Sequence, residues 1–404
     1  MTARRPAGGA ATLLTRRLRR RRPGPAEARS LAQTGSVRRI LALKPHDQLG
    51  DLLLITPALR ALRERYPEAR LALVTREFLS PLARRVPLVD EVWVLPAMHG
   101  GRGLGAWLET IGAVARFRPD LAWVMNSVSR SKTADALAAL SRARVVIGRS
   151  RVGTGPLSPD APEDPFERAS AEAPDPVYDL DLPVARRSTH QVDRLLDLVR
   201  WATGEPSSTR LALEPRANER REAAQALASA LAATMPIGAP PRASGGWPRI
   251  AGLHPGAANP LKCWPLESFV ELGVGLLASQ DEEPPALVVF DSPRERGRAA
   301  AVCAGLEARG ARAAFLPARG SEGFAALCSR LSLLVCNDSG VAHIASALGV
   351  PTVSFHSLGD PREWAPRGQR AVALSAPAGI GAIPVSAALE AAKALLKGPP
   401  PEDV

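Results

Sequence analysis

From Arg39 onward, short runs of apolar residues alternate with longer segments in which apolar and polar residues recur at helical spacing. This alternation is the pattern of βαβ units, in which a buried strand is followed by an amphipathic helix and the strands form a parallel sheet. Helical segments are expected to bridge the strands. Strands are expected at 40–44, 71–75, 91–95, 121–125 and 145–147 in the first part of the chain, and at 250–254, 287–290, 313–316, 333–336 and 352–355 in the second.

Two helices in the first part have recognisable ends. Residues 51–66 are mostly helical and end at Pro67, because proline lacks the amide hydrogen that a continuing helix needs. Pro57 lies inside this segment and leaves its start open, since Thr56 followed by proline also suits the first turn of a new helix. A second amphipathic helix is expected at 190–203.

Two stretches break the rhythm of strands and helices. Residues 151–188 are rich in proline, glycine and acidic residues and are expected to form an extended surface insertion. Residues 235–247 are rich in proline, glycine and serine and indicate an interdomain linker. A chain of 404 residues is long enough for two domains, here 38–234 and 248–390, followed by a tail at 391–404. Both are expected to be doubly wound α/β domains that face a cleft at the carboxyl ends of their strands.

The formal net charge of +12 is concentrated at the N-terminus. Residues 1–39 hold eleven arginines and one acid, Glu27, so this segment carries +10 and the remainder only +2. A basic arm, residues 1–37, is expected to be disordered and attracted to an acidic surface, and its charge alone does not choose between anionic lipid and nucleic acid. The near-neutral body and an aromatic content of 4% offer no stacking surface for bases, which argues against nucleic acid.

Membrane spans, secretory leaders and zinc sites find no support in the sequence. The longest apolar runs, such as 286–290, are far shorter than the roughly 18 residues of a spanning helix. Leu13 and Leu14 stand too close to Arg16 for a secretory signal, whereas the scarcity of acids keeps a mitochondrial presequence open. The four cysteines show no CxxC spacing, so the sequence predicts no zinc site and a reducing cytoplasm.

The most informative motif, 337–343, follows an expected strand and opens a helix. Asp338 or Ser339 suits the cap of that helix, and Gly340 lets a ligand approach backbone amides that favour a phosphate. His343 lies one turn further on the same side. A well-capped helix with a structural histidine is the alternative interpretation of the same residues.

A second motif, 254–265, leaves the first expected strand of the second domain. Gly256 makes the loop flexible, and Lys262 lies beside a helix start marked by Pro265, where an ammonium group suits a phosphate oxygen. The alternative is an ordinary turn with a solvated lysine. Because both loops follow strands of one domain, they are expected at the same edge of its sheet.

A third motif, 44–51, follows the first strand of the first domain. Gly50 suits a tight turn, and Asp51 opens the next helix, where its carboxylate either accepts a proton from a hydroxyl group or caps the helix.

The glycines of 101–105 lack the GxGxxG spacing, and no GxxxxGK[ST] pattern occurs in the chain. The sequence therefore predicts neither a dinucleotide-binding fingerprint nor a P-loop.

Together, in this order and in two separate domains, these motifs resemble those of glycosyltransferase family 9, and the resemblance covers residues 38–390. Each motif alone is weak, whereas their combination is specific. The family's motifs are matched by Gly50-Asp51, Thr56-Pro57-Ala58-Leu59, Pro255-Gly256-Ala257, Lys262-Cys263-Trp264-Pro265, Asn337 to His343 with Ala347, Gly349 and Pro351, and, in part, by Asp360, Pro361, Trp364 and Pro366.

The resemblance implies a GT-B fold and an inverting, metal-independent transfer of a heptose from an ADP-heptose to a lipopolysaccharide-core or related cell-envelope glycan. Asp51 then matches the catalytic base and Lys262 the contact of the leaving phosphate. No metal and no cofactor is expected besides the nucleotide sugar. The donor site is expected to include Gly256, Lys262, Glu295, Asp338, Ser339, Gly340 and His343, and the acceptor side Gly50 and Asp47.

The same resemblance implies a monomeric bacterial enzyme of the cytoplasm that meets a lipid-linked glycan at the inner face of the cytoplasmic membrane. The arginine-rich arm would provide its peripheral contact with anionic lipid. A nucleotide-sugar-binding protein of the same fold without turnover is the alternative, which the presence of both Asp51 and Lys262 disfavours.

Overall fold

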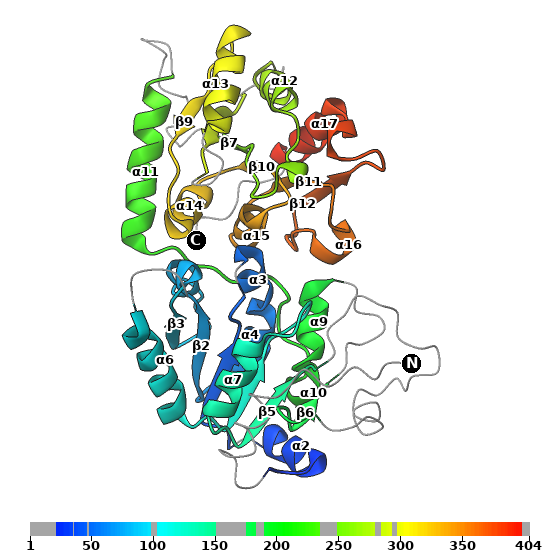
Figure 1. Cartoon of the computed structure of the whole chain (residues 1–404). Coiled ribbons are helices and arrows are strands. Elements are labelled where there is room, and N and C mark those ends of the chain that lie inside the picture. The colour runs from blue at the N-terminus through cyan, green and yellow to red at the C-terminus, as the bar shows by residue number, and fades with distance from the viewer. Residues whose placement is uncertain are drawn as a thin grey trace. The chain divides into compact units, whose positions relative to one another are not determined.

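The computed structural model describes residues 22–397 apart from 35, 47, 98–102, 151–174, 183–189, 235–248, 279–283 and 293–296. The chain divides into two compact units, of which the first ends at Thr209 and the second begins at Arg210 (Figure 1). Each unit holds a parallel sheet of six strands covered by helices. The predicted α/β fold with two doubly wound domains is therefore confirmed.

The first unit, called unit 1, follows the expected strand positions closely. Its strands are β1 (Arg39–Leu43), β2 (Arg70–Arg76), β3 (Glu91–Leu95), β4 (Leu121–Val124), β5 (Val145–Gly148) and β6 (Leu180–Asp181). Its helices are α2 (Pro25–Gln33), α3 (Leu49–Leu54), α4 (Thr56–Arg65), η1 (Glu77–Leu79), α5 (Ser80–Ala83), α6 (Gly103–Phe117), α7 (Lys132–Leu140), α9 (Gln191–Asp197) and α10 (Arg200–Thr203). The expected helix at 51–66 is thus two helices that meet at Ile55, with Pro57 in the first turn of α4.

The strands of unit 1 lie in the order β3-β2-β1-β4-β5-β6, and neighbouring strands are parallel. The chain moves outward from β1 to β3 and then returns to the other side of β1. This reversal creates a topological switch point between the carboxyl ends of β1 and β4, where doubly wound sheets commonly bind ligands. The motif 44–51 leaves the sheet at this point.

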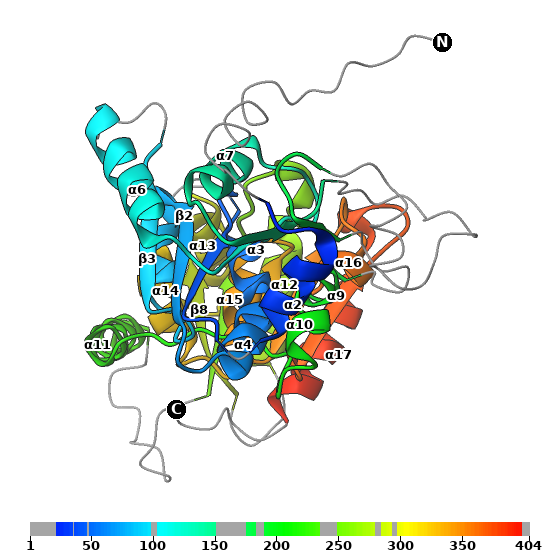
Figure 2. The same ribbon diagram turned by 90° about the horizontal axis from the view of Figure 1, so that it is seen from below.

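Two helix layers cover the sheet of unit 1. Leu41 and Leu43 of β1 belong to the core under α6 and α7, to which those helices contribute Val114 and Leu137. Helices α4, α9 and α10 form the other layer, and Figure 2 shows the two groups on opposite sides of the strands. Because successive side chains of a strand point to opposite faces, one strand supports both layers.

The second unit, called unit 2, starts with a helix. Its strands are β7 (Ile250–His254), β8 (Ala286–Phe290), β9 (Ala314–Leu316), β10 (Leu333–Asn337), β11 (Thr352–His356) and β12 (Ala371–Ser375). Its helices are α11 (Ala217–Ala232), η2 (Pro260–Lys262), α12 (Leu266–Leu277), α13 (Arg298–Ala308), α14 (Ser321–Cys328), α15 (Gly340–Ala347), α16 (Pro361–Trp364), η3 (Ile380–Ala382) and α17 (Val385–Leu396).

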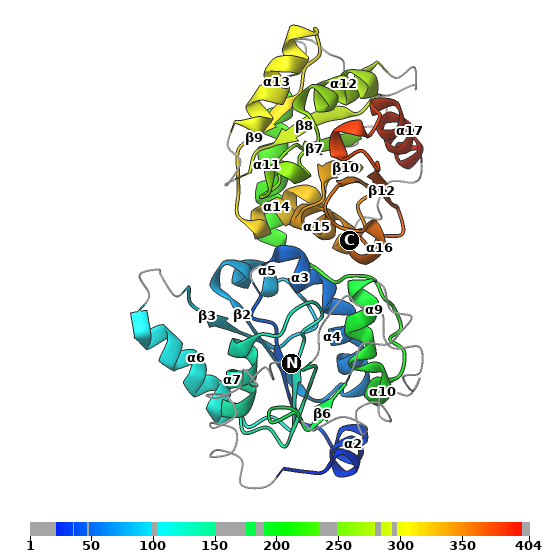
Figure 3. The same ribbon diagram turned by 45° about the vertical axis from the view of Figure 1, so that its right-hand side comes forward.

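The strands of unit 2 lie in the order β12-β11-β10-β7-β8-β9, which is the order of unit 1 counted from β7. Its switch point therefore falls between β7 and β10, whose ends pair at His254 and Cys336. Helices α12, α13 and α17 cover one face with residues such as Leu272, Val302 and Ala388, and α14 and α15 lie on the other (Figure 3). The motifs 254–265 and 337–343 both leave the sheet at this switch point.

The expected disorder of the N-terminal arm is wrong for its second half. Helix α2 lies within that arm, and Ala28 and Ala32 on its inner face are fully buried. The Arg22 Nε donates to Asp179 Oδ1 at 2.8 Å, which fixes the chain ahead of the helix. The burial of two alanines and the pairing of Arg22 thus offset the effect of the positive charge on folding. Residues 1–21 lie outside the described part of the chain.

Three further elements differ from the sequence expectation. The residues of α11 fall within the expected first domain, but this helix packs against α14 and β9 of unit 2, so the units divide at Thr209. The expected linker, 235–247, lies outside the described residues. Within the expected insertion 151–188, β6 adds a strand to the sheet, and Tyr178 beside it is 2% exposed. Edge strand β12 was not expected, since its residues are only partly buried.

None of the helices in the described part of the chain has the length and apolar character needed to cross a bilayer. The longest, α11, has 16 residues and carries four charged side chains in its first two turns.

Candidate active site

In unit 2, the buried residue Asn337 joins the two loops of the expected donor site. Its Nδ2 donates to the carbonyl oxygens of Pro255 at 2.9 Å and Gly256 at 3.3 Å, and its Oδ1 accepts from the Trp264 amide at 2.9 Å. A buried amide that uses both its donor and its acceptor side fixes the geometry of what it bridges. The sequence indicates the motif that contains Asn337 but not this role.

Trp264 anchors the loop that carries Lys262. Its ring is fully buried, and its centroid lies 4.2 Å from that of Phe355 and 5.2 Å from that of Phe269. The indole Nε1 donates to the Ile383 carbonyl at 3.2 Å. Each aromatic pair contributes about 0.5–1.5 kcal/mol beyond area burial. The lysine two residues earlier is therefore held at the switch point by a rigid neighbour.

Lys262 and Asp338 form an ion pair at the carboxyl edge of the unit 2 sheet. The Lys262 Nζ lies 2.6 Å from Asp338 Oδ2, and the lysine side chain is 30% exposed while the aspartate side chain is 9% exposed. An ammonium group has three N–H donors, of which this contact uses one. The arrangement thus presents a cation toward solvent with donors remaining for an anionic ligand.

Helix α15 begins without a side-chain cap. Ser339 occupies the cap position and makes no capping hydrogen bond, and the Asp338 carboxylate is engaged by Lys262. The alternative of an ordinary capped helix is therefore not observed. Gly340 begins the helix, and its lack of a side chain leaves the amides of the first turn approachable, as phosphate binding requires. His343 lies one turn further and is 4% exposed.

In unit 1, Lys44 and Asp51 form a buried pair at the switch point between β1 and β4. The Lys44 Nζ lies 3.9 Å from Asp51 Oδ1, and the two side chains are 2% and 10% exposed. Burial lowers the pKa of Lys44 from its usual 10.5, and the charge of Asp51 acts in the opposite direction. The carboxylate and the lysine are therefore coupled electrostatically.

Asp51 does not occupy the cap position of its helix. Helix α3 begins at Leu49, with Gln48 at the cap position, so Asp51 is the third helical residue and follows Gly50 directly. The capping alternative is not supported by this placement, and a role as proton acceptor stays a prediction. Two other expected site residues, Asp47 and Glu295, lie outside the described part of the chain.

Three polar side chains that the sequence did not single out are buried at the same edge of unit 1. Asn126 and Ser127 follow β4, Thr75 lies near the end of β2, and each is 1% exposed or less. Among the described residues, neither the Asn126 amide nor the two hydroxyl groups has a hydrogen-bond partner. Buried polar groups are normally paired, so these atoms mark a place that water or a polar ligand completes.

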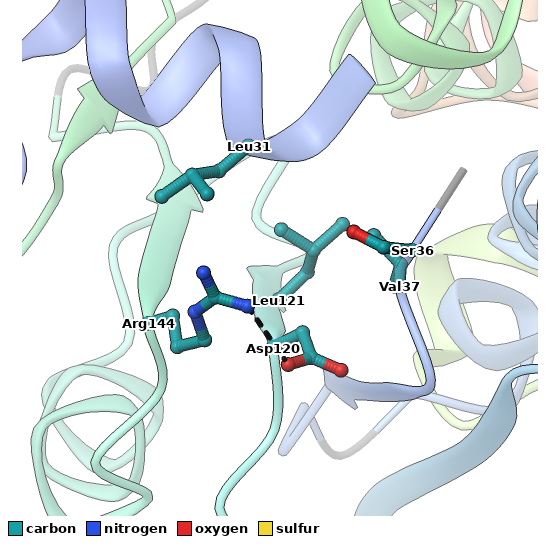
Figure 4. Close-up of a pocket in the computed structure, with 6 residues that line it drawn as sticks. All are labelled: Leu31, Ser36, Val37, Asp120, Leu121 and Arg144. Atoms are coloured by element: carbon teal, nitrogen blue, oxygen red, sulfur yellow. Dashed lines mark ion pairs between the residues drawn. The ribbon is translucent and has the colours of Figure 1, made fainter. Parts of the chain in front are cut away.

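The described residues contain no group of three or more His, Cys, Asp or Glu side chains placed to hold a metal ion. A hollow of ≈ 10 Å³ lies at the opposite, amino edge of the unit 1 strands, between α2 and residues such as Val37, Asp120 and Arg144 (Figure 4). Its volume is about that of one water molecule, and Arg144 pairs with Asp120 at 3.6 Å. This hollow is a packing gap and not part of the candidate site.

The fold and these loops define a class of protein. The chain resembles the glycosyl transferase family 9 structure from Veillonella parvula, with 20% identity, a TM-score of 0.69 and coverage of 90% of this chain and 99% of that one. It also resembles E. coli heptosyltransferase WaaC, solved with ADP, with 19% identity, a TM-score of 0.63 and coverage of 88% and 99%. The fold is GT-B, the fold of a large class of glycosyltransferases.

The family follows from the sequence comparison. Residues 165–383, more than half of the chain, match the model of glycosyltransferase family 9 (heptosyltransferase). Lipopolysaccharide heptosyltransferase 2 of Salmonella typhimurium is 24% identical over 331 residues, which cover 80% of this chain and 84% of that protein. The chain belongs to glycosyltransferase family 9 and is a glycosyltransferase, as its motifs predicted.

Proposed function

We propose that this enzyme transfers a heptose from an ADP-heptose to a lipopolysaccharide-core or related cell-envelope glycan, with inversion at the anomeric carbon. Membership of the family, the name of the Salmonella typhimurium relative and the ADP in the E. coli heptosyltransferase structure support this donor and acceptor. The observation that carries the proposal is the convergence of Lys262, Asp338 and the uncapped start of α15 at one switch point.

The donor side of the reaction belongs to unit 2. When the sugar leaves its nucleotide, negative charge develops on the diphosphate oxygen, and fixed donors aimed at that oxygen lower the barrier. Lys262 and the first amides of α15 supply such donors. Gly256 and Gly340 let the diphosphate approach the backbone, and no bound metal is required for this charge stabilisation.

The acceptor side belongs to unit 1. Asp51 removes the proton from the acceptor hydroxyl as its oxygen attacks the anomeric carbon, and the bond from that carbon to the diphosphate breaks with its electron pair passing to ADP. The Lys44 Nζ lies 3.9 Å from Asp51 Oδ1 and is placed to position this carboxylate at the switch point. The buried Asn126, Ser127 and Thr75 lie at the same sheet edge and suit polar groups of the acceptor.

The basic N-terminal segment then holds the enzyme at the cytoplasmic face of the membrane. Residues 1–21 contain seven arginines and no acid, and arginine near an anionic leaflet contributes on the order of 1 kcal/mol each at modest salt. A peripheral, monomeric enzyme in this position meets an acceptor that is anchored in lipid.

A donor screen tests the proposal. The purified enzyme is given ADP-heptose, GDP-mannose or UDP-glucose with heptose-deficient lipopolysaccharide, and nucleotide release is measured with and without acceptor. We expect acceptor-dependent release of ADP alone, unchanged by EDTA, and a product whose anomeric configuration is opposite to that of the donor. Release of GDP or UDP, or retention of configuration, would contradict the proposed donor or mechanism.

A further inference from the structure

Asp338 has a second neighbour besides Lys262. The His356 imidazole, at the end of β11, places its Nδ1 4.0 Å from Asp338 Oδ1, while its Nε2 lies 2.9 Å from the Ser354 hydroxyl. His356 is 1% exposed and Ser354 is fully buried. Among the described residues, no hydrogen-bond partner lies within reach of the His356 Nδ1. A buried ring nitrogen without a partner therefore faces the carboxylate that holds Lys262.

We propose that His356 is a positioning residue of the donor site, which takes over the Asp338 carboxylate when a diphosphate draws Lys262 away from it. The inference rests on the proposed function in one respect, namely that the donor's diphosphate binds Lys262.

Electrostatics gives the reason why such a partner is needed. In the free protein the Asp338 carboxylate is compensated by Lys262 at 2.6 Å. A diphosphate that competes for the same ammonium group brings further negative charge next to that carboxylate, and like charges at this distance are unfavourable. A second positive donor at the other oxygen of Asp338 removes the conflict, and the His356 Nδ1, 4.0 Å from Oδ1, is placed to supply it.

The Ser354 hydroxyl suits both states of the ring. A carboxylate repels a lone pair, so the neutral ring is best placed with its proton on Nδ1 toward Asp338 and with Nε2 accepting from Ser354. When the ring becomes protonated, the hydroxyl rotates and accepts from Nε2. Ser354 thus has a hydrogen bond with Nε2 before and after the ring is protonated, and Nδ1 stays directed at Asp338.

The charges around His356 determine the direction of its titration. Burial lowers the pKa of His356 from its usual 6.5, the charge of Asp338 raises it, and the charge of Lys262 lowers it. These two charges come from the turn after β10 and from η2, while Ser375, the strand neighbour on β12, is uncharged. Withdrawal of Lys262 from Asp338 therefore raises the pKa of His356 and favours uptake of a proton.

The first experiment needs no ligand. The pKa of His356 is measured by NMR titration of ring-labelled protein, with its signal assigned by its loss in His356→Phe. In Lys262→Met we expect this pKa to rise by roughly 1 pH unit, and Lys393→Met on α17 serves as the matched control without effect. An unchanged pKa of His356 in Lys262→Met would overturn the inference, whichever donor the enzyme uses.

The second experiment measures proton uptake on binding. ADP-ribose is the probe, because its diphosphate is esterified at both ends and does not titrate near pH 6, unlike the terminal phosphate of ADP. Calorimetry near pH 6 in buffers of different ionisation enthalpy is expected to show net proton uptake on ADP-ribose binding in the wild type, and none in His356→Phe. Equal uptake in both proteins would overturn the inference.

The two failures can be told apart. If ADP-ribose and ADP both fail to bind the wild type, the proposed donor is wrong, and the titration of Lys262→Met alone decides the role of His356. If ADP-ribose binds without proton uptake while turnover with ADP-heptose is normal, the proposed function stands and the inference fails.

Discussion

Lys44 and Asp51 are held together by shared burial and not by a short contact, because their charged atoms are 3.9 Å apart and neither side chain is more than 10% exposed. Removal of one member of a buried pair leaves the other charge uncompensated. We therefore expect Lys44→Met to lower the free energy of unfolding more in the wild type than in an Asp51→Asn background. A coupling of about 0.5–3 kcal/mol is expected from a double-mutant cycle measured by urea unfolding. Additive effects of the two substitutions would mean that the groups do not interact.

The same lysine predicts a pH dependence of stability. Because the pKa of Lys44 is lowered from 10.5 in the folded protein, the unfolded chain binds more protons than the folded one in the pH range between the folded-state pKa and 10.5. The free energy of unfolding attributable to Lys44 therefore rises with pH across that window. We expect the stability difference between wild type and Lys44→Met to grow from pH 8 to pH 10 in favour of the wild type. A constant difference over this range would contradict the pKa shift.

Asp51→Asn separates catalysis from structure. The substitution keeps the size of the side chain and removes the proton acceptor, so turnover is expected to fall by roughly 100-fold or more. ADP affinity is expected to change little, since the proposed donor site lies in unit 2. The melting temperature is expected to fall no more than in Lys44→Met, since Asp51 does not occupy the cap of α3 and only its pairing with Lys44 is lost. If turnover and stability fall in proportion, Asp51 is structural, and Asp47 becomes the next candidate for the base.

Lys262→Ala tests the donor site. Loss of a charge-assisted contact is expected to weaken ADP binding by roughly 1.5–3 kcal/mol, measured by calorimetry. The contact is charge-assisted, so the difference between the variants is expected to shrink as salt concentration rises. Lys393→Ala on α17 is the matched control. Equal ADP affinity in wild type and Lys262→Ala would show that the loop after β7 does not contact the diphosphate.

Because part of the N-terminal segment folds as α2, its membrane role is tested with two truncated variants. A variant that begins at Arg22 removes seven arginines and keeps α2, so it is expected to lose salt-sensitive binding to anionic vesicles without loss of stability. A variant that begins at Ser36 also removes Ala28 and Ala32 from the core and is expected to melt at lower temperature. If the Arg22 variant binds vesicles as well as the full chain does, residues 1–21 are not the membrane contact.

The sequence predicted the central strands of each sheet better than the elements that flank the sheets. Strands β3 and β7 are mainly apolar runs, and their predicted and observed bounds coincide. Helix α2 was missed because it buries only two alanines among charged residues, which gives a weak periodic signal. Residues 217–232, which form α11, were placed in the first domain because the linker was sought in a stretch rich in proline, glycine and serine, and that composition does not show on which unit the preceding helix packs.

The candidate site was predictable where it follows from topology and not where it follows from side-chain packing. Lys262 and Asp338 follow strands that a doubly wound order makes neighbours, so their meeting could be expected. The contact of His356 with Asp338 depends on where β11 ends beside β10, and a single histidine after an apolar run carries no such information. Asn126 was not predictable either, because it is distinguished by the burial of its side-chain amide, which the sequence does not show.

Among the described residues, a lysine–aspartate pair lies at each switch point, and the more exposed member is the aspartate in unit 1 and the lysine in unit 2. In unit 1 the lysine side chain is only 2% exposed and the aspartate 10%, so a substrate that reaches the pair contacts the carboxylate. In unit 2 the aspartate is 9% exposed and the lysine 30%, so an arriving substrate meets the cation. In the proposed function, one strand order used twice supplies the proton acceptor in one copy and the anion receptor in the other, and the burial of each side chain distinguishes the two roles.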